Sequence, residues 1–160
     1  MRWRFSLCSA GGEAVIRIGP ETFDPGVEST RLTTGRTDIG ALATFVGLVR
    51  DETGGLLSLT LEHYPGMAER HLAAIEAEAR RRWRILDLVV VHRVGRLVPG
   101  EPIVFVGVVA THRTEAFAAC EFLMDWLKTR APFWKFEERV EGGRWIDPRP
   151  EDEGRAERWD

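Results

Sequence analysis

Two lysine residues are the side chains in this sequence whose type and surroundings best suit acid–base or nucleophilic chemistry. The 160-residue chain contains 22 Lys and Arg residues, of which only Lys128 and Lys135 are lysines. A guanidinium stays protonated at ordinary pH, whereas an amine near aromatic residues can lose its proton and act as a base or nucleophile. Aromatic residues surround Lys135 in the segment 132–137, PFWKFE. The alternative, in which Lys128 neutralises a helix C terminus and Lys135 is an exposed strand residue, stays open from these residues alone.

A second group of polar residues stands where an apolar strand is followed by a helix. His112 and Arg113 occupy this boundary. Free backbone N–H groups and the positive end of the helix dipole favour anions there, so phosphate or carboxylate is the natural ligand. Alternatively, Arg113 is an ordinary surface residue and His112 packs at the strand end. Arg50, which follows another apolar strand, is either a third cation of a site or a solvated strand end.

The elements that must position these residues follow from apolar periodicity and turn signals, which predict seven strands and three helices. The expected strands are 14–18, 41–49, 56–63, 86–94, 103–110, 133–140 and 144–146. The expected helices start after the N-cap Asp24, run over 67–84, and run from Thr114 as N-cap to a stop at Pro132. Two hairpins are expected, one around the turn 51–55 and one around Gly142-Gly143.

The order β-α-ββ-α-ββ-α-ββ, with mostly hairpin links, indicates an α+β fold with a largely antiparallel sheet. The strands 86–94 and 103–110 are apolar enough to be central. A doubly wound nucleotide-binding fold is disfavoured because no Gly-rich loop joins a strand to a helix. A single domain over residues 1–160 is expected, with a charged surface arm at 147–160.

Composition excludes several classes of function. A net charge of −3 gives no electrostatic footprint for nucleic acid, so no nucleic-acid partner is expected. No stretch approaches the roughly 18 apolar residues that span a bilayer, and the start lacks the apolar run of a secretion signal. We therefore expect no membrane partner and a cytoplasmic location.

Other polar residues are expected to be structural. Cys8 and Cys120 are too few for a disulfide framework, and Cys120 falls in an apolar helical pattern that predicts a buried thiol. His63 and His92 lack metal-ligand spacing, so no metal site is expected. The run 80–82, three arginines, is typical of a solvated helix face.

Five segments between about Ile16 and Trp145 carry a family likeness. They are Gly40–Arg50, Leu61–Met67, His92–Gly95 with Pro99-Gly100, His112-Arg113 with Ala116-Phe117, and Met124–Lys135. In order and spacing they resemble the family of molybdopterin synthase catalytic (large) subunits. The segment 128–135, KTRAPFWK, is the most specific of them, whereas the strand motifs alone would be weak.

This resemblance implies an α/β-hammerhead fold with an additional antiparallel β subdomain. It implies a sulfurtransferase that converts cyclic pyranopterin monophosphate into molybdopterin, in molybdenum cofactor biosynthesis, by installing the dithiolene sulfurs. The implied sulfur donor is the thiocarboxylated C terminus of a small ubiquitin-like carrier subunit that ends in Gly-Gly. The implied assembly is a homodimer within a heterotetramer, and no cofactor is expected.

The resemblance also implies site residues. Lys128 and Lys135 are expected to be catalytic and to bind substrate, one contacting the thiocarboxylate tail and the other handling protons or forming a transient adduct. The other expected substrate-binding residues are Leu48, Val49, Arg50, His112, Arg113, Phe136, Glu137 and Arg149, the last reaching a neighbouring protomer. Arg50, His112 and Arg113 are expected to hold the cyclic phosphate.

The chain departs from the family pattern at two of these positions. Leu48 stands where the family commonly has Lys, and Phe136 stands where it commonly has a basic residue. We expect a backbone contact at residue 48 and a pocket that tolerates both changes. The stretch 1–15 is longer than usual in the family and has no assigned role. The alternative function is a non-catalytic anion-binding or adaptor domain of the same fold, against which the two retained lysines speak.

Overall fold

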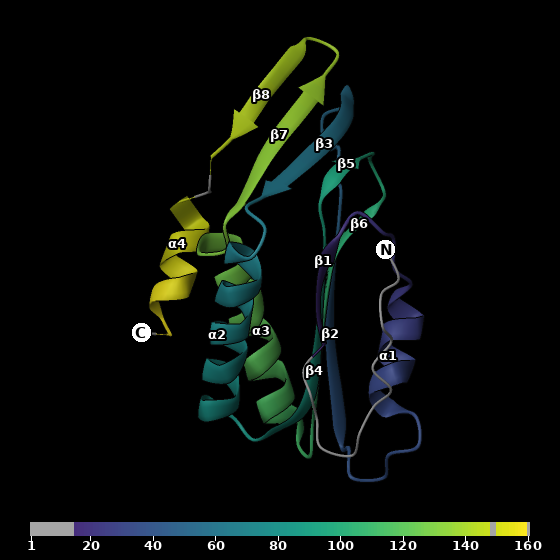
Figure 1. Ribbon diagram of the computed structural model, residues 1–160, viewed down its shortest axis with the longest axis vertical. Helices are drawn as coiled ribbons and strands as arrows, with labels where there is room; N and C mark the ends of the chain where they lie inside the picture. Colours follow the sequence, from purple (N-terminus) through teal and green to yellow (C-terminus); the bar gives the residue numbers. More distant parts are fainter. Residues whose placement is uncertain (1–14, 148–149, 160) are drawn as a thin grey trace.

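The computed structural model describes residues 15–147 and 150–159 (Figure 1). The expected N-terminal extension, apart from Val15, and Arg149 lie outside these residues. In chain order the elements are β1 (Val15–Gly19), α1 (Pro25–Thr33), β2 (Ala41–Leu48), β3 (Leu56–His63), α2 (Met67–Arg82), β4 (Ile85–Arg93), β5 (Gly95–Leu97), β6 (Pro102–Ala110), α3 (Arg113–Thr129), β7 (Phe133–Arg139), β8 (Gly142–Ile146) and α4 (Pro150–Glu157).

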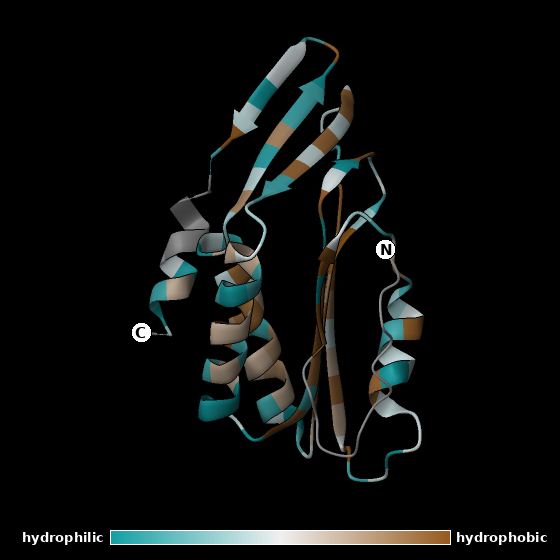
Figure 2. Ribbon diagram, in the orientation of Figure 1, coloured by the Kyte–Doolittle hydropathy of each residue, from teal (hydrophilic) through white to brown (hydrophobic). Residues whose placement is uncertain are grey.

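The first sheet has the strand order β1-β4-β6-β2 and is antiparallel except for the β1–β4 pair. Helices α2 and α3 cover one face and α1 covers the other (Figure 1). Seven consecutive residues are buried in each of β4 and β6, which confirms that these strands are central. Figure 2 shows the matching hydrophobic colouring of these strands. A strand covered on both faces needs apolar side chains at every position, and this explains why the runs are continuous.

The second sheet has the order β5-β3-β7-β8, is wholly antiparallel, and lies beyond one end of the first sheet (Figure 1). Its apolar cluster contains Val49, Leu56, Leu61 and Leu97. Ile103 packs against this cluster and also against the main core, so the two sheets share packing. The α+β class and the antiparallel subdomain expected from the sequence are confirmed.

The hairpin expected around residues 51–55 is wrong. Strand β2 pairs with β6 in the first sheet, whereas β3 pairs with β5 and β7 in the second. The turn therefore carries the chain from one sheet to the other. Strand β6 is buried on both faces and needs a neighbouring strand on each side. The pairing of β2 with β6 is therefore favoured over the predicted hairpin of β2 with β3. The three-residue strand β5 falls inside a segment that the sequence predicted as a connection.

Two local boundaries also differ from the sequence prediction. Helix α3 begins at Arg113 with His112 as N-cap, whereas Thr114 was expected. In the last hairpin, Val140-Glu141 form the turn and the two glycines begin β8. Gly143 lies beneath the Phe136 ring, where an added Cβ would be 2.3 Å from Cζ, so close packing explains this glycine.

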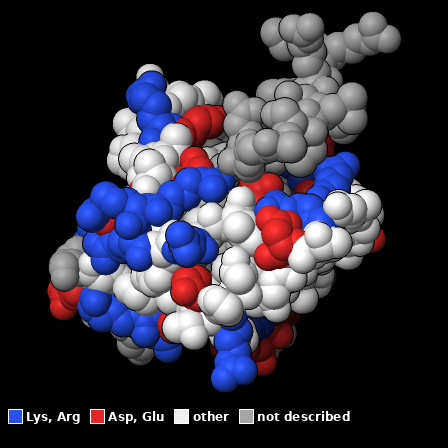
Figure 3. All heavy atoms as spheres, turned by 90° about the horizontal axis from the view of Figure 1, so that it is seen from below, with Lys and Arg blue, Asp and Glu red and all other residues white. Residues whose placement is uncertain are grey.

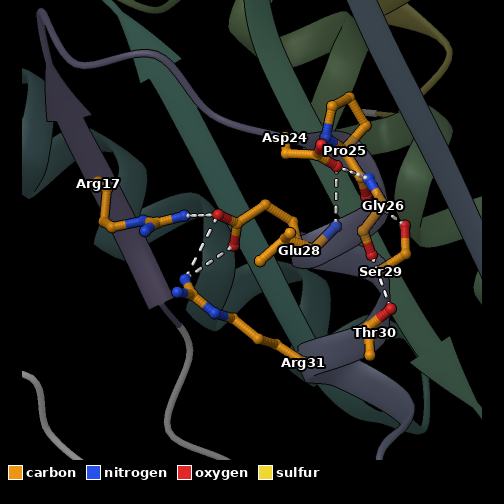
Figure 4. A network of polar contacts seen from close by, with 9 residues as sticks. Arg17, Asp24, Pro25, Gly26, Glu28, Ser29, Thr30 and Arg31 are labelled. Carbon is orange, nitrogen blue, oxygen red and sulfur yellow. Dashed lines mark hydrogen bonds and ion pairs between the residues drawn. The ribbon is translucent and has the colours of Figure 1, made fainter.

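Other helix ends are confirmed. Asp24 caps α1 by accepting hydrogen bonds from the N–H groups of Gly26 (2.7 Å) and Val27 (3.0 Å). Further along α1, buried Glu28 pairs with Arg17 of β1 and with Arg31 (Figure 4). This network secures α1 to the first sheet. Helix α3 ends at Thr129, shortly before Pro132, as expected.

The C-terminal segment is not the simple surface arm that the sequence predicted. It forms α4, and the Trp159 indole N–H donates to Asp125 Oδ2 on α3 at 2.8 Å. The Trp159 ring also packs edge-on against Trp83 and Phe122, at centroid distances of 5.5 and 5.6 Å. One aromatic anchor after a polar helix is enough to attach the segment, and charge counting alone misses it.

Candidate functional site

The structure divides the expected site residues between the two ends of the first sheet. In the β2–β6 ladder, Ala41 lies opposite Ala110 at one end and Leu48 lies opposite Pro102 at the other. Arg50 follows the second end, whereas His112 and Arg113 follow the first. At about 3.3 Å per residue, the two groups are about 25 Å apart. One chain therefore cannot place them on one phosphate, and that part of the sequence prediction is wrong for a single chain.

Lys135 lies on the inner face of β7, toward the first sheet. It is half-buried and pairs across the ladder with Leu61, whose side chain belongs to the apolar cluster between the sheets. Residues two apart on a strand share a face, so Phe133 and Glu137 accompany Lys135. Phe136 points to the opposite face and packs against Trp145 with a ring centroid distance of 5.2 Å. The Phe136 side chain thus lies away from the side of the sheet that carries Lys135.

A buried histidine supports this strand from the first sheet. The His92 ring stacks on Phe133 with a centroid distance of 3.9 Å and an interplanar angle of 5°. Its Nδ1 lies 2.9 Å from the carbonyl oxygen of Arg93, which can only accept, so Nδ1 carries the proton. Burial, with smaller contributions from the charges of Lys135 and His63, outweighs the opposing effect of this hydrogen bond and lowers the His92 pKa to about 4. His92 is therefore neutral at physiological pH, in keeping with its expected structural role.

Lys128 occupies the last turn of α3 and is exposed. The helix ends one residue later, and β7 starts four residues after that at Phe133. Both lysines thus lie where α3 passes into β7, at the same end of the first sheet as Arg50 (Figure 1). The structure shows why the two lysines, seven residues apart in sequence, share a region of the molecule.

A cavity of about 620 Å³ opens beside this region. It is lined by Arg50, Glu52, Thr53, Glu137, Arg139, Glu141, Gly142, Gly143 and Arg144. Arg50 is exposed and pairs with Glu52 at 2.9 Å. The cavity brings together two residues expected from the sequence, Arg50 and Glu137, and adds two arginines that the sequence analysis missed.

The carboxylate of Glu137 organises one wall of the cavity. Its Oε2 accepts from Arg139 Nε at 3.0 Å and from Arg144 Nη2 at 3.3 Å. Burial opposes its ionisation, but these hydrogen bonds outweigh burial and hold its pKa below the ordinary value. Arg139 also donates to Thr53 Oγ1 and to the carbonyl of Gly54. The pair follows from the hairpin register, which places Arg144 opposite Glu137 and which the predicted turn at Gly142-Gly143 did not reveal.

Leu48 and Val49, both expected to bind substrate, differ in exposure. The Leu48 side chain is 55% exposed at the end of β2. Val49 is buried, and its N–H and C=O already bond to Glu101 and Gly100 at 2.9 and 2.8 Å. Val49 therefore acts as part of the core rather than as a free contact group.

The other end of the sheet carries the second candidate site. His112 and Arg113 are exposed at the start of α3, and the described residues offer the Arg113 guanidinium no hydrogen bond or ion pair. Figure 3 shows this end of the molecule, where arginine side chains, drawn in blue, gather over part of the surface. The arginines of the run 80–82, at the nearby end of α2, pair with Glu76 and Glu78. Of the three, Arg81 has the solvated side chain that the sequence predicted, at 71% exposed. The side chains of Arg80 and Arg82 are 27% and 31% exposed, and Arg82 also packs over the Phe122 ring, so the prediction is wrong for these two. An exposed guanidinium at a helix N terminus can hold an anion.

Sequence comparison identifies the family. The MoaE protein family model matches residues 18–130. The chain belongs to this family. A molybdopterin synthase catalytic subunit from Pseudomonas aeruginosa is 53% identical over 150 residues, covering 91% of this chain and 98% of the relative.

Solved MoaE structures have the same fold. The molybdopterin biosynthesis MoaE protein from Burkholderia ambifaria is 52% identical with a TM-score of 0.79, covering 92% of this chain and 98% of that one. Molybdopterin synthase from Staphylococcus aureus is 32% identical with a TM-score of 0.73, covering 82% and 96%. The α/β-hammerhead expected from the sequence is therefore the fold of this MoaE chain.

Other candidate chemistry is limited within the described residues. No group of three His, Cys, Asp or Glu side chains there could hold a metal ion. Burial raises the pKa of Cys120 to about 11, which confirms a buried, inert thiol. None of the helices in the described parts of the chain is long and apolar enough to cross a membrane.

Proposed function

We propose that this MoaE chain transfers sulfur from the thiocarboxylated C terminus of a small ubiquitin-like carrier to cyclic pyranopterin monophosphate, forming the dithiolene of molybdopterin. Its relatives are molybdopterin synthase catalytic subunits. The observation that carries the proposal is the placement of Lys135, half-buried on the inner face of β7 beside an arginine-lined cavity. An amine held there can meet a small anionic substrate bound by the arginines of the cavity.

Lys128 and Lys135 divide the work in this proposal. One amine contacts the thiocarboxylate tail, and the other moves protons or forms a transient adduct during sulfur addition. Phe133, stacked on His92, anchors the strand that presents Lys135. The exposure of Lys128 leaves it accessible to a macromolecular partner.

The complete site is proposed to need two copies of the chain. Arg50 and the lysines lie about 25 Å from His112 and Arg113 in one chain, along the β2–β6 ladder. In the expected homodimer, the start of α3 in one copy completes the Arg50 end of the other. Arg149 belongs to the same prediction, but it lies outside the described residues.

The organisation of the chain is also part of the proposal. The packing of Ile103 against both apolar clusters supports a single domain that includes both sheets. The cytoplasmic location stays a prediction, to be tested by cell fractionation.

Single Lys128→Ala and Lys135→Ala variants test the catalytic assignment. With thiocarboxylated carrier and cyclic pyranopterin monophosphate, each is expected to lose activity by about 100-fold or more, since each lacks an amine used in the reaction. Product is measured as the fluorescent oxidised pterin. Arg96→Gln, an exposed change on the outer face of the second sheet, is the control. Undiminished product from both lysine variants would refute the assignment and favour an adaptor role.

Mixed dimers test the two-copy site. Lys135→Ala and Arg113→Ala homodimers are both expected to be weak. Mixing the two variants under conditions that exchange subunits should restore up to about a quarter of wild-type activity, because half the dimers are mixed and each then holds one intact site. No recovery, with exchange confirmed by mass spectrometry, would contradict the shared site.

A further inference from the structure

The cavity beside Lys135 contains an arginine with no role in the expected site. We propose that Arg144 and Arg50 together form an anion-binding subsite for the phosphate of the small-molecule substrate, and that Glu137 positions Arg144. This inference rests on the proposed function and deepens it.

The two arginines on Glu137 differ in how their donors are used. Arg139 is only 19% exposed in its side chain and donates to Glu137, Thr53 and Gly54, so its guanidinium is committed to holding the wall together. Arg144 is 67% exposed and donates to Glu137 through Nη2 alone. Its other N–H donors have no partner among the described residues. Arg144 is therefore the guanidinium of this pair that can still bind a ligand.

Arg50 supplies the second cation across the cavity. Its side chain is 59% exposed, and its ion pair is with Glu52, which is 61% exposed. Exposed pairs of this kind are weak, so an oxyanion can replace the carboxylate at little cost. Glu141 also lines the cavity, and its charge favours a monoanion over a more highly charged ligand, because both guanidiniums already face carboxylates.

The position of the cavity suits a substrate that must meet Lys135. Glu137 follows Lys135 by two residues on the same face of β7, which separates their Cα atoms by about 7 Å. A phosphate held between Arg50 and Arg144 leaves the rest of a compact molecule within reach of the amine. The cavity volume of about 620 Å³ is in the range of small-molecule sites.

The same sheet contains a matched control for Arg144. Glu137 and Glu138 are neighbours on β7 and face opposite sides of the sheet. Arg144 Nη2 lies 3.3 Å from Glu137 Oε2, and Arg96 Nη2 lies 3.4 Å from Glu138 Oε2. Arg96 is 59% exposed, close to the value for Arg144. Removing either arginine changes the charge by the same amount. Only the Glu137–Arg144 pair lines the cavity, so only the change at Arg144 affects the subsite.

Steady-state kinetics of Arg144→Gln, Arg144→Lys and Arg96→Gln test the proposal, with pterin and carrier varied in turn. Arg144→Gln is expected to raise KM for the pterin about tenfold or more, because a charge-assisted hydrogen bond is lost, while kcat changes less than about threefold. Arg144→Lys should recover part of the loss, and Arg96→Gln should match wild type. An unchanged pterin KM in Arg144→Gln, or a rise confined to the carrier KM, would overturn the subsite.

Calorimetric binding of cyclic pyranopterin monophosphate, without carrier, separates this inference from the proposed function. If wild type binds the pterin and Arg144→Gln binds about tenfold more weakly, the subsite stands even if turnover is absent and the proposed function fails. If both proteins bind equally, or neither binds, the subsite is refuted whatever the turnover. Thermal unfolding of the exposed Arg144 variants checks that they are folded.

Discussion

The two sheets of this protein differ in what their strands bury. In the first sheet, β4 and β6 each contain seven consecutive buried residues, whereas no residue of β7 in the second sheet is fully buried. The first sheet is a close-packed scaffold covered by helices on both faces. The second presents Glu137, Arg139 and Arg144 to a cavity, and half-buried Lys135 lies two residues before Glu137 on the same face of β7. The first sheet thus provides the rigid scaffold and the second carries the candidate site. Val49 and Ile103 belong to the apolar packing that connects the two sheets.

The largest expected difference between the two sheets is in the free energy of unfolding that is lost when an aromatic side chain is replaced by alanine. Phe105→Ala removes a fully buried ring from β6 and should lower the free energy of unfolding by about 3 to 5 kcal/mol. Phe136→Ala removes a half-buried ring from β7 and should cost about 1 kcal/mol. Urea denaturation of both variants measures the difference. Equal losses would show that the second sheet is as tightly packed as the first.

An intermediate effect is expected where the sheets meet at His92. The folded-state pKa of about 4 lies below the ordinary 6.5, so the unfolded chain binds the proton more readily. Stability present above pH 6.5 is therefore lost as pH falls toward 4, by roughly 3 kcal/mol in all.

His92→Phe keeps a ring to stack on Phe133 and removes the titrating group. Unfolding free energies at several pH values should show a shallower loss between pH 6.5 and 4 than wild type. A slope identical to wild type would mean that other groups carry the acid sensitivity.

The smallest expected effect concerns the exposed pair at the cavity mouth. Glu52→Gln removes the partner of Arg50 and should change the free energy of unfolding by less than about 0.5 kcal/mol. The freed guanidinium should lower KM for the pterin by about twofold. A clear loss of stability, with KM unchanged, would assign this pair to the scaffold rather than to the site.

Local sequence signals predicted most elements because their causes are local. Asp24 and Pro25 start α1, Pro132 stops α3, and continuous apolar runs mark β4 and β6. The errors have non-local causes. The pairing of β2 with β6 depends on residues about 60 positions apart in sequence, and α4 is attached by the contact of Trp159 with Asp125 on α3. Neither contact leaves a pattern within a short window.

The candidate site shows the same difference between features with local causes and features with non-local causes. The types of Lys128 and Lys135, and the segment that contains them, were visible because an amine is chemically distinct in an arginine-rich chain. The cavity was not visible, because the hairpin register that sets Arg144 opposite Glu137 is a property of the folded sheet. Phe136 was expected in the pocket because the family resemblance implied it, but strand alternation turns its side chain to the other face.

The sequence by itself determined the α+β class, the family, the central strands and the two lysines, since these depend on residue type and short spacing. The tertiary structure alone decided that Arg50 and Arg113 lie at opposite ends of the first sheet, and that Arg50, Glu137 and Arg144 share a cavity. Distances between residues far apart in sequence follow from strand order and register. These are set by the burial of whole strands against one another, and no single residue specifies them.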